Sequence, residues 1–302
     1  MNRELPLWRS ILFVPVLNDK FVQGAPKRGA DCIQLDLEDA IPPDQKDSAR
    51  QKVGEVADSL AENGCDVIVR INRSFRLAIP DIEASVRTSV CALTLPKVPN
   101  AAHVRSLVEV VEDVERERGI EIGHTQLVVM IETAEALEQM TEIALASPRI
   151  VGLIVGAEDL AVSMGMDPTH QALLVPNVRA VGAARTAGCL PLGFVGSVAG
   201  YSDLNEYRGL IREARSLGFA GAFAIHPDQV NILNQEFSPS DAEIDHATRL
   251  VSAFDAAIAK GQGAVSFGGK MIDLPVVERA KSVLAARDRL AEIAQTARRG
   301  AP

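Results

Sequence analysis

The sequence has no long apolar run, and this absence argues against a membrane protein. None of its stretches reaches the roughly 18 consecutive apolar residues that a transmembrane helix requires. The first ten residues, MNRELPLWRS, contain no apolar signal segment. We therefore expect a cytoplasmic protein with no membrane partner.

Cysteine is also scarce, with single residues at Cys32, Cys65, Cys91 and Cys189. They lie far apart and form no CxxC pair, so they predict neither a zinc site nor a disulfide framework. Cys32 and Cys91 fall in apolar runs, where we expect buried thiols. The sequence also lacks a GxGxxG motif after a strand, which argues against a dinucleotide-binding fold.

Positive charge is the third shortage. Lysine and arginine number 31 against 40 aspartate and glutamate residues, which gives a formal net charge of -9 at pH 7. An acidic surface argues against nucleic acid or an anionic membrane surface as a partner. It is compatible with an anionic small ligand held in a local basic pocket.

What the sequence does contain is a regular alternation of apolar runs and helix-length segments. Short runs rich in Val, Ile and Leu are typical of buried strands in a parallel sheet. Helical segments such as 101–119 and 203–217 separate most of the runs, and a glycine, Gly119 or Gly218, marks the end of each; the segment at 81–89 is too short for more than two turns. Eight β/α alternations predict a (β/α)₈ TIM barrel, with a doubly wound open sheet as the alternative. The runs are SILFV (10–14), CIQLDL (32–37), VIVRI (67–71), CALTLP (91–96), QLVVMI (126–131), VGLIVG (151–156), LPLGF (190–194) and AFAI (222–225).

Two acidic residues end neighbouring strands within the stretch 126–159. The fifth and sixth runs flank a predicted helix over residues 133–146, so the three elements form a βαβ unit. This unit places Glu132 and Asp159 at the same end of adjacent parallel strands. Two carboxylates there are suited to a hard cation such as Mg²⁺. The alternative is that each carboxylate caps the helix after it or faces water.

A cation inside a strand points to a functional site at the same rim. Arg70 lies before Ile71 within VIVRI, and a charge in a barrel strand is costly unless it is paired or binds a ligand. Function in a barrel lies at the carboxyl ends of the strands, so we predict a site where these polar positions converge. For His226, which precedes Pro227 at a helix start, we favour a structural role over that of a base or metal ligand. The rim residues are Asp36, Glu38, Asp39, Arg70, Asn72, Lys97, Glu132, Glu158, Asp159 and His226.

The chain continues past the eighth strand for longer than one barrel helix requires. We predict a catalytic barrel domain over residues 1–238 and an arm or lid over residues 239–302. Within the arm, a glycine-rich loop or hairpin over 260–273 separates two helices. From the residues alone, Asp273 is expected to cap the last helix, which begins near Pro275.

A set of motifs spans nearly the whole chain. They are RSILFVP (9–15), GADCIQLDLEDAIPPDQKDSAR (29–50), VRIN (69–72), LPKV (95–98), MIET (130–133), GAEDLAVSMGM (156–166), GFAGAFAIHPDQV (218–230), EFSPS (236–240) and KGQGAVSFGGKMID (260–273). In this order they resemble the citrate lyase beta-like and malyl-CoA lyase enzymes of the HpcH/HpaI aldolase superfamily. Each motif alone is weak, but the set is specific. The terminal hairpin places the resemblance with the CoA ester lyases, because pyruvate-type aldolases of the superfamily are shorter.

The resemblance implies a Mg²⁺-dependent carbon–carbon lyase that acts on a 3-hydroxyacyl-CoA thioester. Malyl-CoA would give acetyl-CoA and glyoxylate, and citramalyl-CoA would give acetyl-CoA and pyruvate as the 2-oxo acid. It also implies a homotrimer or dimer of trimers in which the arm completes the neighbouring subunit's site. Three alternatives stay open: a citrate lyase beta-like subunit acting on an acyl-carrier thioester, a malyl-CoA thioesterase, and a CoA-independent 2-oxo acid aldolase.

The same resemblance implies roles for the residues that carry the chemistry. Glu132 and Asp159 match the Mg²⁺ ligands, and Glu132 also borders the substrate. Arg70 matches the residue that binds the oxo-acid carboxylate and the forming enolate. Asp273 matches an acid/base supplied by the neighbouring subunit, which reverses the expectation of a simple cap.

The resemblance extends to residues around these groups. Phe13 and Lys20 are similar to positions that contact CoA, and Arg9 is a looser candidate for the same contact. Glu38, counted with the catalytic residues, and Asp39 fall in the LDLED motif, which implies that they orient the site through hydrogen bonds.

Two departures from the family pattern carry expectations of their own. Val16 stands where a glycine usually follows FVP, so the loop beside CoA is expected to take a different backbone path. After the seventh strand, Phe194 and Val195 make the rim more apolar than in malyl-CoA lyases. They predict an acyl group that is bulkier or less polar than malyl.

Overall fold

The computed structural model describes residues 5–198, 203–259 and 265–300, and the chain divides into two compact units. The first unit is Met1–Phe237 and the second is Ser238–Pro302. The division falls one residue before the boundary expected from the sequence. Each unit is described by itself below.

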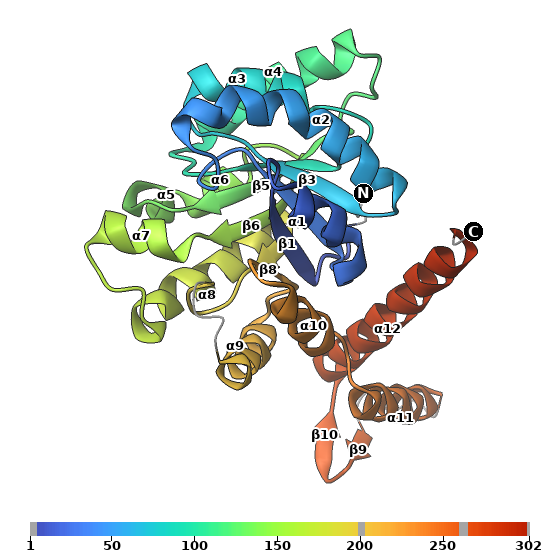
Figure 1. Ribbon diagram of the computed structural model, residues 1–302. Coiled ribbons are helices and arrows are strands. Elements are labelled where there is room, and N and C mark those ends of the chain that lie inside the picture. The colour runs from blue at the N-terminus through green and yellow to red at the C-terminus, as the bar shows by residue number, and fades with distance from the viewer. Residues whose placement is uncertain (1–4, 199–202, 260–264, 301–302) are drawn as a thin grey trace. The chain divides into compact units, whose positions relative to one another are not determined.

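The first unit is built on a parallel β-barrel, as the alternating pattern predicts (Figure 1). The strands pair in the order β7-β6-β5-β4-β3-β2-β1-β8. A single parallel bridge between Leu192 and Gly221 joins the two edges and nearly closes the barrel. Gly221 also lies close to the backbone just before β1, where only a glycine fits, because a Cβ there would lie 1.8 Å from the carbonyl oxygen of Trp8. The strands are β1 (Ser10–Pro15), β2 (Cys32–Asp36), β3 (Asp66–Arg70), β4 (Ala92–Leu95), β5 (Gln126–Ile131), β6 (Ile150–Val155), β7 (Leu190–Leu192) and β8 (Ala222–Ala224).

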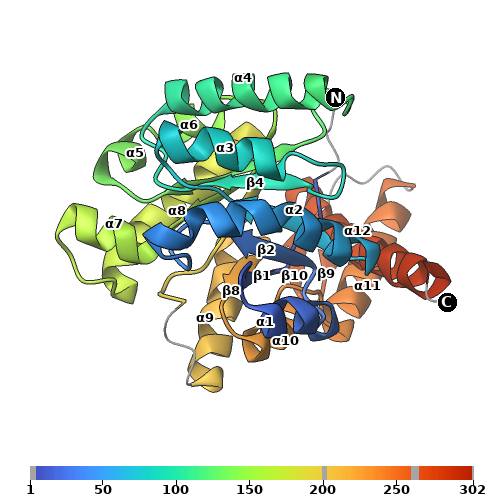
Figure 2. The same cartoon turned by 45° about the horizontal axis from the view of Figure 1, so that its top comes forward.

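Helices surround this barrel, and α2, α3 and α4 lie together over one side of it (Figures 1 and 2). Two helices differ from expectation. Residues 133–146 form two short helices that meet at Gln139 instead of one, and the segment expected at 81–89 is a longer helix that begins before Pro80. The elements are α1 (Asp19–Gly24), η1 (Ala25–Arg28), η2 (Pro43–Gln45), α2 (Lys46–Glu62), α3 (Phe75–Ser85), α4 (Ala101–Glu117), α5 (Ala134–Glu138), α6 (Met140–Ala144), α7 (Ala157–Met164), α8 (His170–Ala187), α9 (Leu204–Leu217) and α10 (Pro227–Glu236).

The barrel core has two layers, which follow from the alternation of side chains along each strand. Residues such as Leu35, Val69 and Val129 belong to the large cluster that includes the helices. Their neighbours Ile68 and Val128 belong to a second cluster, which fills the barrel interior. Side chains two residues apart share a face. Once the interior-facing residues of a strand are known, it therefore follows which residue at its carboxyl end also faces the interior.

The second unit consists of two helices and a hairpin. They are α11 (Asp241–Ile258), β9 (Val265–Phe267), β10 (Lys270–Ile272) and α12 (Leu274–Gly300). The two strands pair antiparallel, with Ile272 opposite Val265. Residues 260–264 of the predicted hairpin lie outside the described part of the chain. Leu250, Phe254 and Val277 lie in the small core of this unit.

The expectations for the cysteines and for membrane spans can be checked on the described residues. The four cysteines are free thiols, with Cys32 buried as predicted and Cys91 only half-buried. None of the described helices combines the length and apolarity needed to cross a membrane.

Candidate active site

The site residues occupy the last interior-facing position of several strands. Asp36 continues the interior phase of Cys32 on β2, and Arg70 continues that of Ile68 on β3. The register places Asp36 directly opposite Arg70. Two parallel hydrogen bonds of 2.7 Å join them, from Nε and Nη2 of Arg70 to the two carboxylate oxygens of Asp36. The sheet register alone therefore builds a bidentate ion pair at the rim.

This ion pair is buried and fixed on both sides. Asp36 is 1% exposed and Arg70 is 8% exposed. Burial by itself would raise the pKa of Asp36, but Arg70 and two backbone N–H groups hold that pKa below its usual value. The third nitrogen of the guanidinium, Nη1, lies 3.0 Å from Glu38 Oε2 and 3.2 Å from Asp39 Oδ2. The guanidinium carbon also lies 5.0 Å from the centre of the Phe13 ring.

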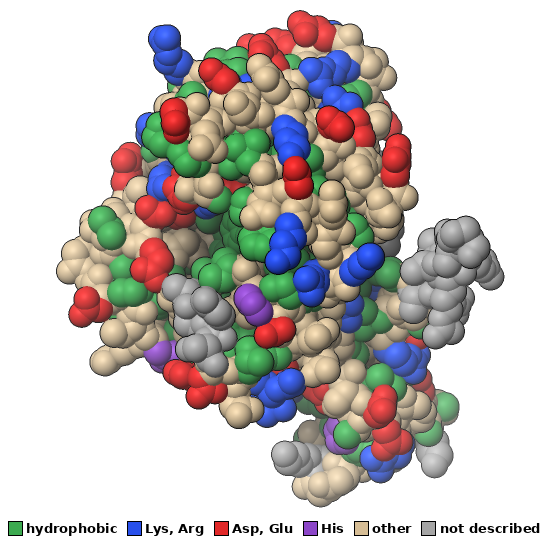
Figure 3. All heavy atoms as spheres, in the orientation of Figure 1, with side chains coloured by type: hydrophobic (Ala, Val, Ile, Leu, Met, Phe, Trp, Pro, Cys, Tyr) green, Lys and Arg blue, Asp and Glu red, His purple; other side chains and the backbone are tan. Residues whose placement is uncertain are grey.

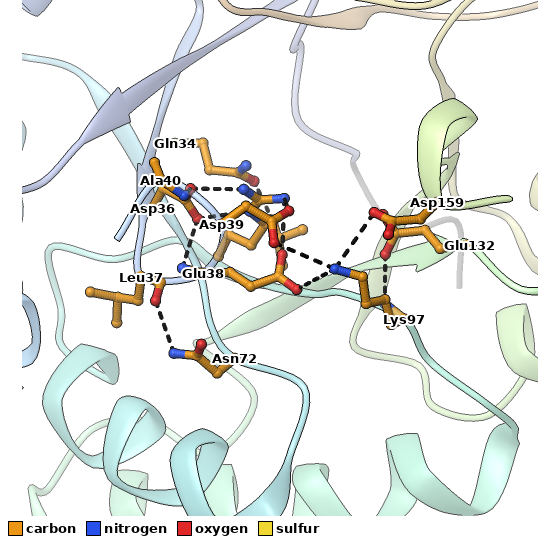
Figure 4. Close-up of polar contacts among 12 residues, drawn as sticks. Gln34, Asp36, Leu37, Glu38, Asp39, Ala40, Asn72, Lys97, Glu132 and Asp159 are labelled. Atoms are coloured by element: carbon orange, nitrogen blue, oxygen red, sulfur yellow. Dashed lines mark hydrogen bonds and ion pairs between the residues drawn. The ribbon is translucent and has the colours of Figure 1, made fainter. Parts of the chain in front are cut away.

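Lys97 lies between the acidic loop after β2 and the acidic residues after β5 and β6 (Figure 4). Its Nζ donates to Glu38 Oε1 at 2.9 Å and lies 3.5 Å from Oδ2 of Asp159. Its backbone N donates to Glu132 Oε2 at 2.6 Å. Lys97 has φ of 48°, in the left-handed region that side-chain-bearing residues rarely adopt. Burial would lower the pKa of Lys97, but its carboxylate partners hold that pKa above its usual value.

Glu132 continues the interior phase of Met130 on β5 and is deeply buried. It is 3% exposed, and burial, aided by the nearby charges of Glu38 and Asp159, raises its pKa to about 7. Its carboxylate lies in the space that Gly156 leaves free, because a Cβ at Gly156 would lie 2.4 Å from Glu132 Oε1. Among the described residues, none donates a hydrogen bond to that Oε1 atom.

Asp159 completes the group from the first turn of α7, which Gly156 precedes as N-cap. Its side chain is 43% exposed, so it faces open space where Glu132 does not. Within the described part of the chain, no three acidic, histidine or cysteine side chains converge as a ready-made metal cage. A metal bound at Glu132 and Asp159 would therefore take its remaining ligands from water or substrate.

A cavity of about 770 Å³ opens beside these groups. Figure 3 shows the hollow, with hydrophobic side chains inside it and lysine and arginine side chains beside it. Its polar wall includes Arg70, Glu132 and Asp159, and its edge includes the exposed side chains of Lys20 and Arg28. The apolar wall includes Phe13, Met130, Ile154, Phe194 and Phe223.

Phe13 and Lys20 thus lie on the cavity with the rim residues, whereas Arg9 does not. Arg9 precedes β1, at the opposite end of the barrel, and binds both carboxylate oxygens of Asp31. That position argues against the predicted contact of Arg9 with CoA. Asp273 lies in the second unit, exposed, just before α12, and its carbonyl accepts from the N–H of Val277.

The remaining expectations concern neighbouring loops. His226 is the N-cap of α10: its Nδ1 accepts from the backbone N–H of Asp228, and the side-chain Oε1 of Gln229 accepts from the His226 N–H. This matches the structural role favoured from the sequence, although His226 also lines the cavity. Val16 is fully buried in the core. Phe194 lines the cavity and packs edge-on against Tyr207, and Val195 is buried beside it.

Two functional positions were not assigned a role from the sequence. The sequence places Lys97 at the rim but predicts no partner for it. Nothing in the pattern TLPKVP indicates the left-handed backbone of Lys97. Gly156 was treated only as the end of a strand. The alternation of side chains along β6 could have identified Gly156, because Gly152, Ile154 and Gly156 share one face of that strand. On this face Gly156 lies against the side chain of Glu132.

A barrel with a buried arginine, a carboxylate cluster and a cavity at the carboxyl ends of its strands is typical of an enzyme whose active site lies at that rim. The family model for HpcH/HpaI aldolase/citrate lyase matches residues 9–227. The chain belongs to this family, and its relatives are carbon–carbon lyases.

Three relatives illustrate the breadth of the match. Citrate lyase subunit beta of Leuconostoc mesenteroides subsp. cremoris is 36% identical over 293 residues, which cover 94% of each chain. L-malyl-CoA/beta-methylmalyl-CoA lyase of Cereibacter sphaeroides is 31% identical over 297 residues, covering 89% of this chain and 90% of the relative. The structure of the protein CitE from Mycobacterium tuberculosis, in complex with magnesium, acetoacetate and coenzyme A, matches with a TM-score of 0.71 at 25% identity, covering 92% of this chain and 97% of that one.

Proposed function

We propose that this protein is a Mg²⁺-dependent lyase that cleaves a carbon–carbon bond of a 3-hydroxyacyl-CoA to give an acyl-CoA and a 2-oxo acid. The observation that carries the proposal is a buried carboxylate, Glu132, and a buried guanidinium, Arg70, on one rim beside a cavity of about 770 Å³. That volume is in the range of small-molecule sites. The malyl-CoA lyase relative and the magnesium and coenzyme A complex of CitE support the same class.

The residues at the rim fit a hard divalent cation. In the described part of the chain, five carboxylates lie around Arg70 and Lys97, and burial raises the pKa of Glu132 to about 7. Glu38 Oε2 is buried, and its contact in the described part of the chain is the ion pair with Arg70 Nη1 at 3.0 Å. We assign Glu132 and Asp159 as the ligands, because both are oxygen donors and Asp159 is open to the cavity. A Mg²⁺ ion there would acidify the substrate hydroxyl and polarise the carbonyl that forms from it.

Arg70 is assigned to the carboxylate of the oxo acid and to the enolate oxygen. Asp36 holds the Nε and Nη2 edge of the guanidinium, so the Nη1 edge is the one that remains to face substrate. That edge now pairs with the buried Glu38 at 3.0 Å and with Asp39, whose side chain is 55% exposed, at 3.2 Å. Of these two acids, Asp39 lines the cavity. A fixed guanidinium can therefore exchange a mobile carboxylate for that of the substrate without moving itself.

Protonation of the leaving carbon is assigned to Asp273. It is an exposed acid at the end of the hairpin in the second unit, and the family resemblance gives it this role. We propose that it acts from the neighbouring subunit of a homotrimer or a dimer of trimers. Turnover without Asp273 should fall roughly 10²–10⁴-fold while metal binding survives.

The apolar wall of the cavity bears on the acyl group. Met130, Ile154 and Phe223 form its floor, one interior layer below the rim, and Phe194 adds a ring on one side. A methyl-bearing substrate such as citramalyl-CoA buries apolar surface there, at roughly 0.8 kcal/mol per buried methyl-sized group. We therefore favour citramalyl-CoA over malyl-CoA. A carrier-bound thioester is the second candidate, because citrate lyase subunit beta is 36% identical to this chain.

The test is a cleavage assay with purified protein. Malyl-CoA and citramalyl-CoA are incubated in parallel with Mg²⁺ or with EDTA, the oxo acid is trapped as its phenylhydrazone, and free thiol is measured separately. We expect oxo acid with Mg²⁺, none with EDTA, and the higher kcat/KM for citramalyl-CoA. Asp159→Asn should lose this activity, while Asp113→Asn, an exposed acid on α4, should keep it.

Other outcomes separate the alternatives. Free thiol without oxo acid indicates a thioesterase. Cleavage of a carrier-bound acyl group, but not of the CoA ester, indicates a citrate lyase beta-like subunit. Cleavage of a free hydroxy acid without CoA indicates an aldolase. Each of these results would overturn the CoA ester lyase proposal.

A further inference from the structure

Lys97 contacts both carboxylates that are assigned to the metal, through two different groups. Its backbone N donates to Glu132 Oε2 at 2.6 Å, and its Nζ lies 3.5 Å from Asp159 Oδ2. The same Nζ reaches Glu38 Oε1 at 2.9 Å and lies 3.5 Å from Asp39 Oδ1. Figure 4 shows the ammonium between the acids of the loop after β2 and Asp159. The lysine side chain thus supplies positive charge where the cluster is most acidic.

An ammonium and a divalent cation cannot share Asp159. Mg²⁺ requires its carboxylate oxygen at about 2.1 Å. An ammonium 3.5 Å from the same oxygen would then lie within a few ångströms of a doubly charged ion, and at such distances repulsion is several kcal/mol even at an effective dielectric constant of about 20. One cation must leave as the other binds.

The structure offers the lysine side chain another place. A second cavity of about 430 Å³ is lined by Lys97, Glu132 and Asp159, and also by Glu135. Lys97 is absent from the lining of the larger cavity, whereas Glu132 and Asp159 line both. The ammonium can therefore move away from Asp159 on the side opposite the proposed substrate, where Glu135 presents another carboxylate.

We propose that Lys97 is a built-in counter-cation that the divalent metal displaces from Asp159, so that metal binding is an exchange of cations and Lys97 sets its affinity. This inference rests on the function proposed above. Lys97 acts as a positioning residue: its ammonium holds Asp159 and Glu38 before the metal binds. Its backbone N–H holds Glu132 throughout, and any residue other than proline at position 97 retains that N–H.

The first test is the affinity of the full-length protein for Mn²⁺, a paramagnetic probe for the Mg²⁺ site. Titrations by calorimetry and by electron paramagnetic resonance compare the wild type with Lys97→Met, Lys97→Arg and Lys20→Met. We expect Lys97→Met to bind Mn²⁺ about tenfold more tightly, because the competing charge is gone. Lys97→Arg keeps the charge and should stay near wild type. Lys20→Met removes the same charge from the cavity edge and should change affinity less than about threefold, since Lys20 forms no ion pair with these acids in the described part of the chain.

The second test is thermal unfolding, which does not depend on turnover. In EDTA, Lys97→Met should unfold at a lower temperature than the wild type, because its acids lose a counter-ion. Saturating MgCl₂ should then raise Tm more in Lys97→Met than in the wild type. A lysine with only a structural role would lower Tm equally with and without MgCl₂.

The outcomes separate the two proposals. If the wild type binds Mn²⁺ and Lys97→Met binds it no more tightly, or gains no extra Tm from MgCl₂, the exchange is refuted and the lyase proposal stands. If neither the wild type nor Lys97→Met binds Mn²⁺, the metal assignment of the proposed function fails and the exchange fails with it.

Discussion

Replacing Gly156 with alanine tests the geometry of the site at a residue that has no side chain of its own. A Cβ at this position would lie 2.4 Å from Glu132 Oε1 and 2.5 Å from its Cγ. Both distances are about 1 Å short of ordinary van der Waals contact, so the carboxylate of Glu132 must move by roughly that amount. The shift costs about 1–3 kcal/mol as overpacking.

The effect on function should exceed the effect on stability. Mg²⁺ tolerates little departure from its octahedral geometry, and a misplacement of about 1 Å can cost about 10²-fold in rate. We expect Gly156→Ala to weaken Mn²⁺ binding at least about tenfold and to lower kcat/KM about 10²-fold. Calorimetric titration, initial rates and urea unfolding measure the three quantities.

A matched control lies four residues earlier on the same face of β6. A Cβ at Gly152 would lie 2.8 Å from Leu192 Cδ1 and 3.3 Å from Val128 Cγ2, far from Glu132. Gly152→Ala should therefore lose comparable stability and keep its affinity for Mn²⁺. The reasoning is refuted if Gly156→Ala, correctly folded, binds Mn²⁺ as tightly as Gly152→Ala.

Three further predictions concern charged groups. Burial raises the pKa of Glu132 to about 7, so its ionisation opposes folding as pH rises from 4.5 to 7. In EDTA, Glu132→Gln should therefore be more stable than the wild type at pH 8, by at most about 3 kcal/mol in urea unfolding, and should show no gain at pH 5. A difference in stability that does not change with pH would contradict this. Arg70→Lys cannot form the bidentate pair with Asp36 and should lower kcat about 10²-fold or more in initial-rate assays, whereas near-normal rates would exclude the assigned role. At the other end of the barrel, Arg149→Met leaves the fully buried Glu115 without its ion pair. The variant should lose about 3–5 kcal/mol of stability in urea unfolding, while the folded fraction keeps its activity. Loss of that activity would show a link between the two ends of the barrel.

The sequence predicted the barrel because the barrel depends on repeated, local signals. Each strand is an apolar run bounded by charge, and glycines with left-handed backbones follow α4 and α9 as expected. The same signals misplaced α3. Pro80 interrupts the helical pattern, and the structure nevertheless continues the helix through it from Phe75 to Ser85.

Part of the site follows from strand phase and direction. Asp36, Arg70 and Glu132 each lie an even number of residues after an interior residue of their strand, so their convergence is visible in the sequence. Strand direction also separates Arg9 from them, because a residue that precedes a parallel strand lies at the amino end of the barrel. The carboxyl-end rule therefore excludes Arg9 on the same grounds that select Arg70.

Lys97 could not be predicted in this way, because its role depends on backbone conformation as well as on side-chain type. A left-handed φ of 48° costs a residue with a Cβ roughly 1–2 kcal/mol. Glycine would adopt that conformation without the cost and would present the same N–H to Glu132. The ion pairs of its ammonium with Glu38 and Asp159 act against that strain. The strained backbone thus points independently to the same conclusion as the ion pairs: the charge at position 97 belongs to the acidic site.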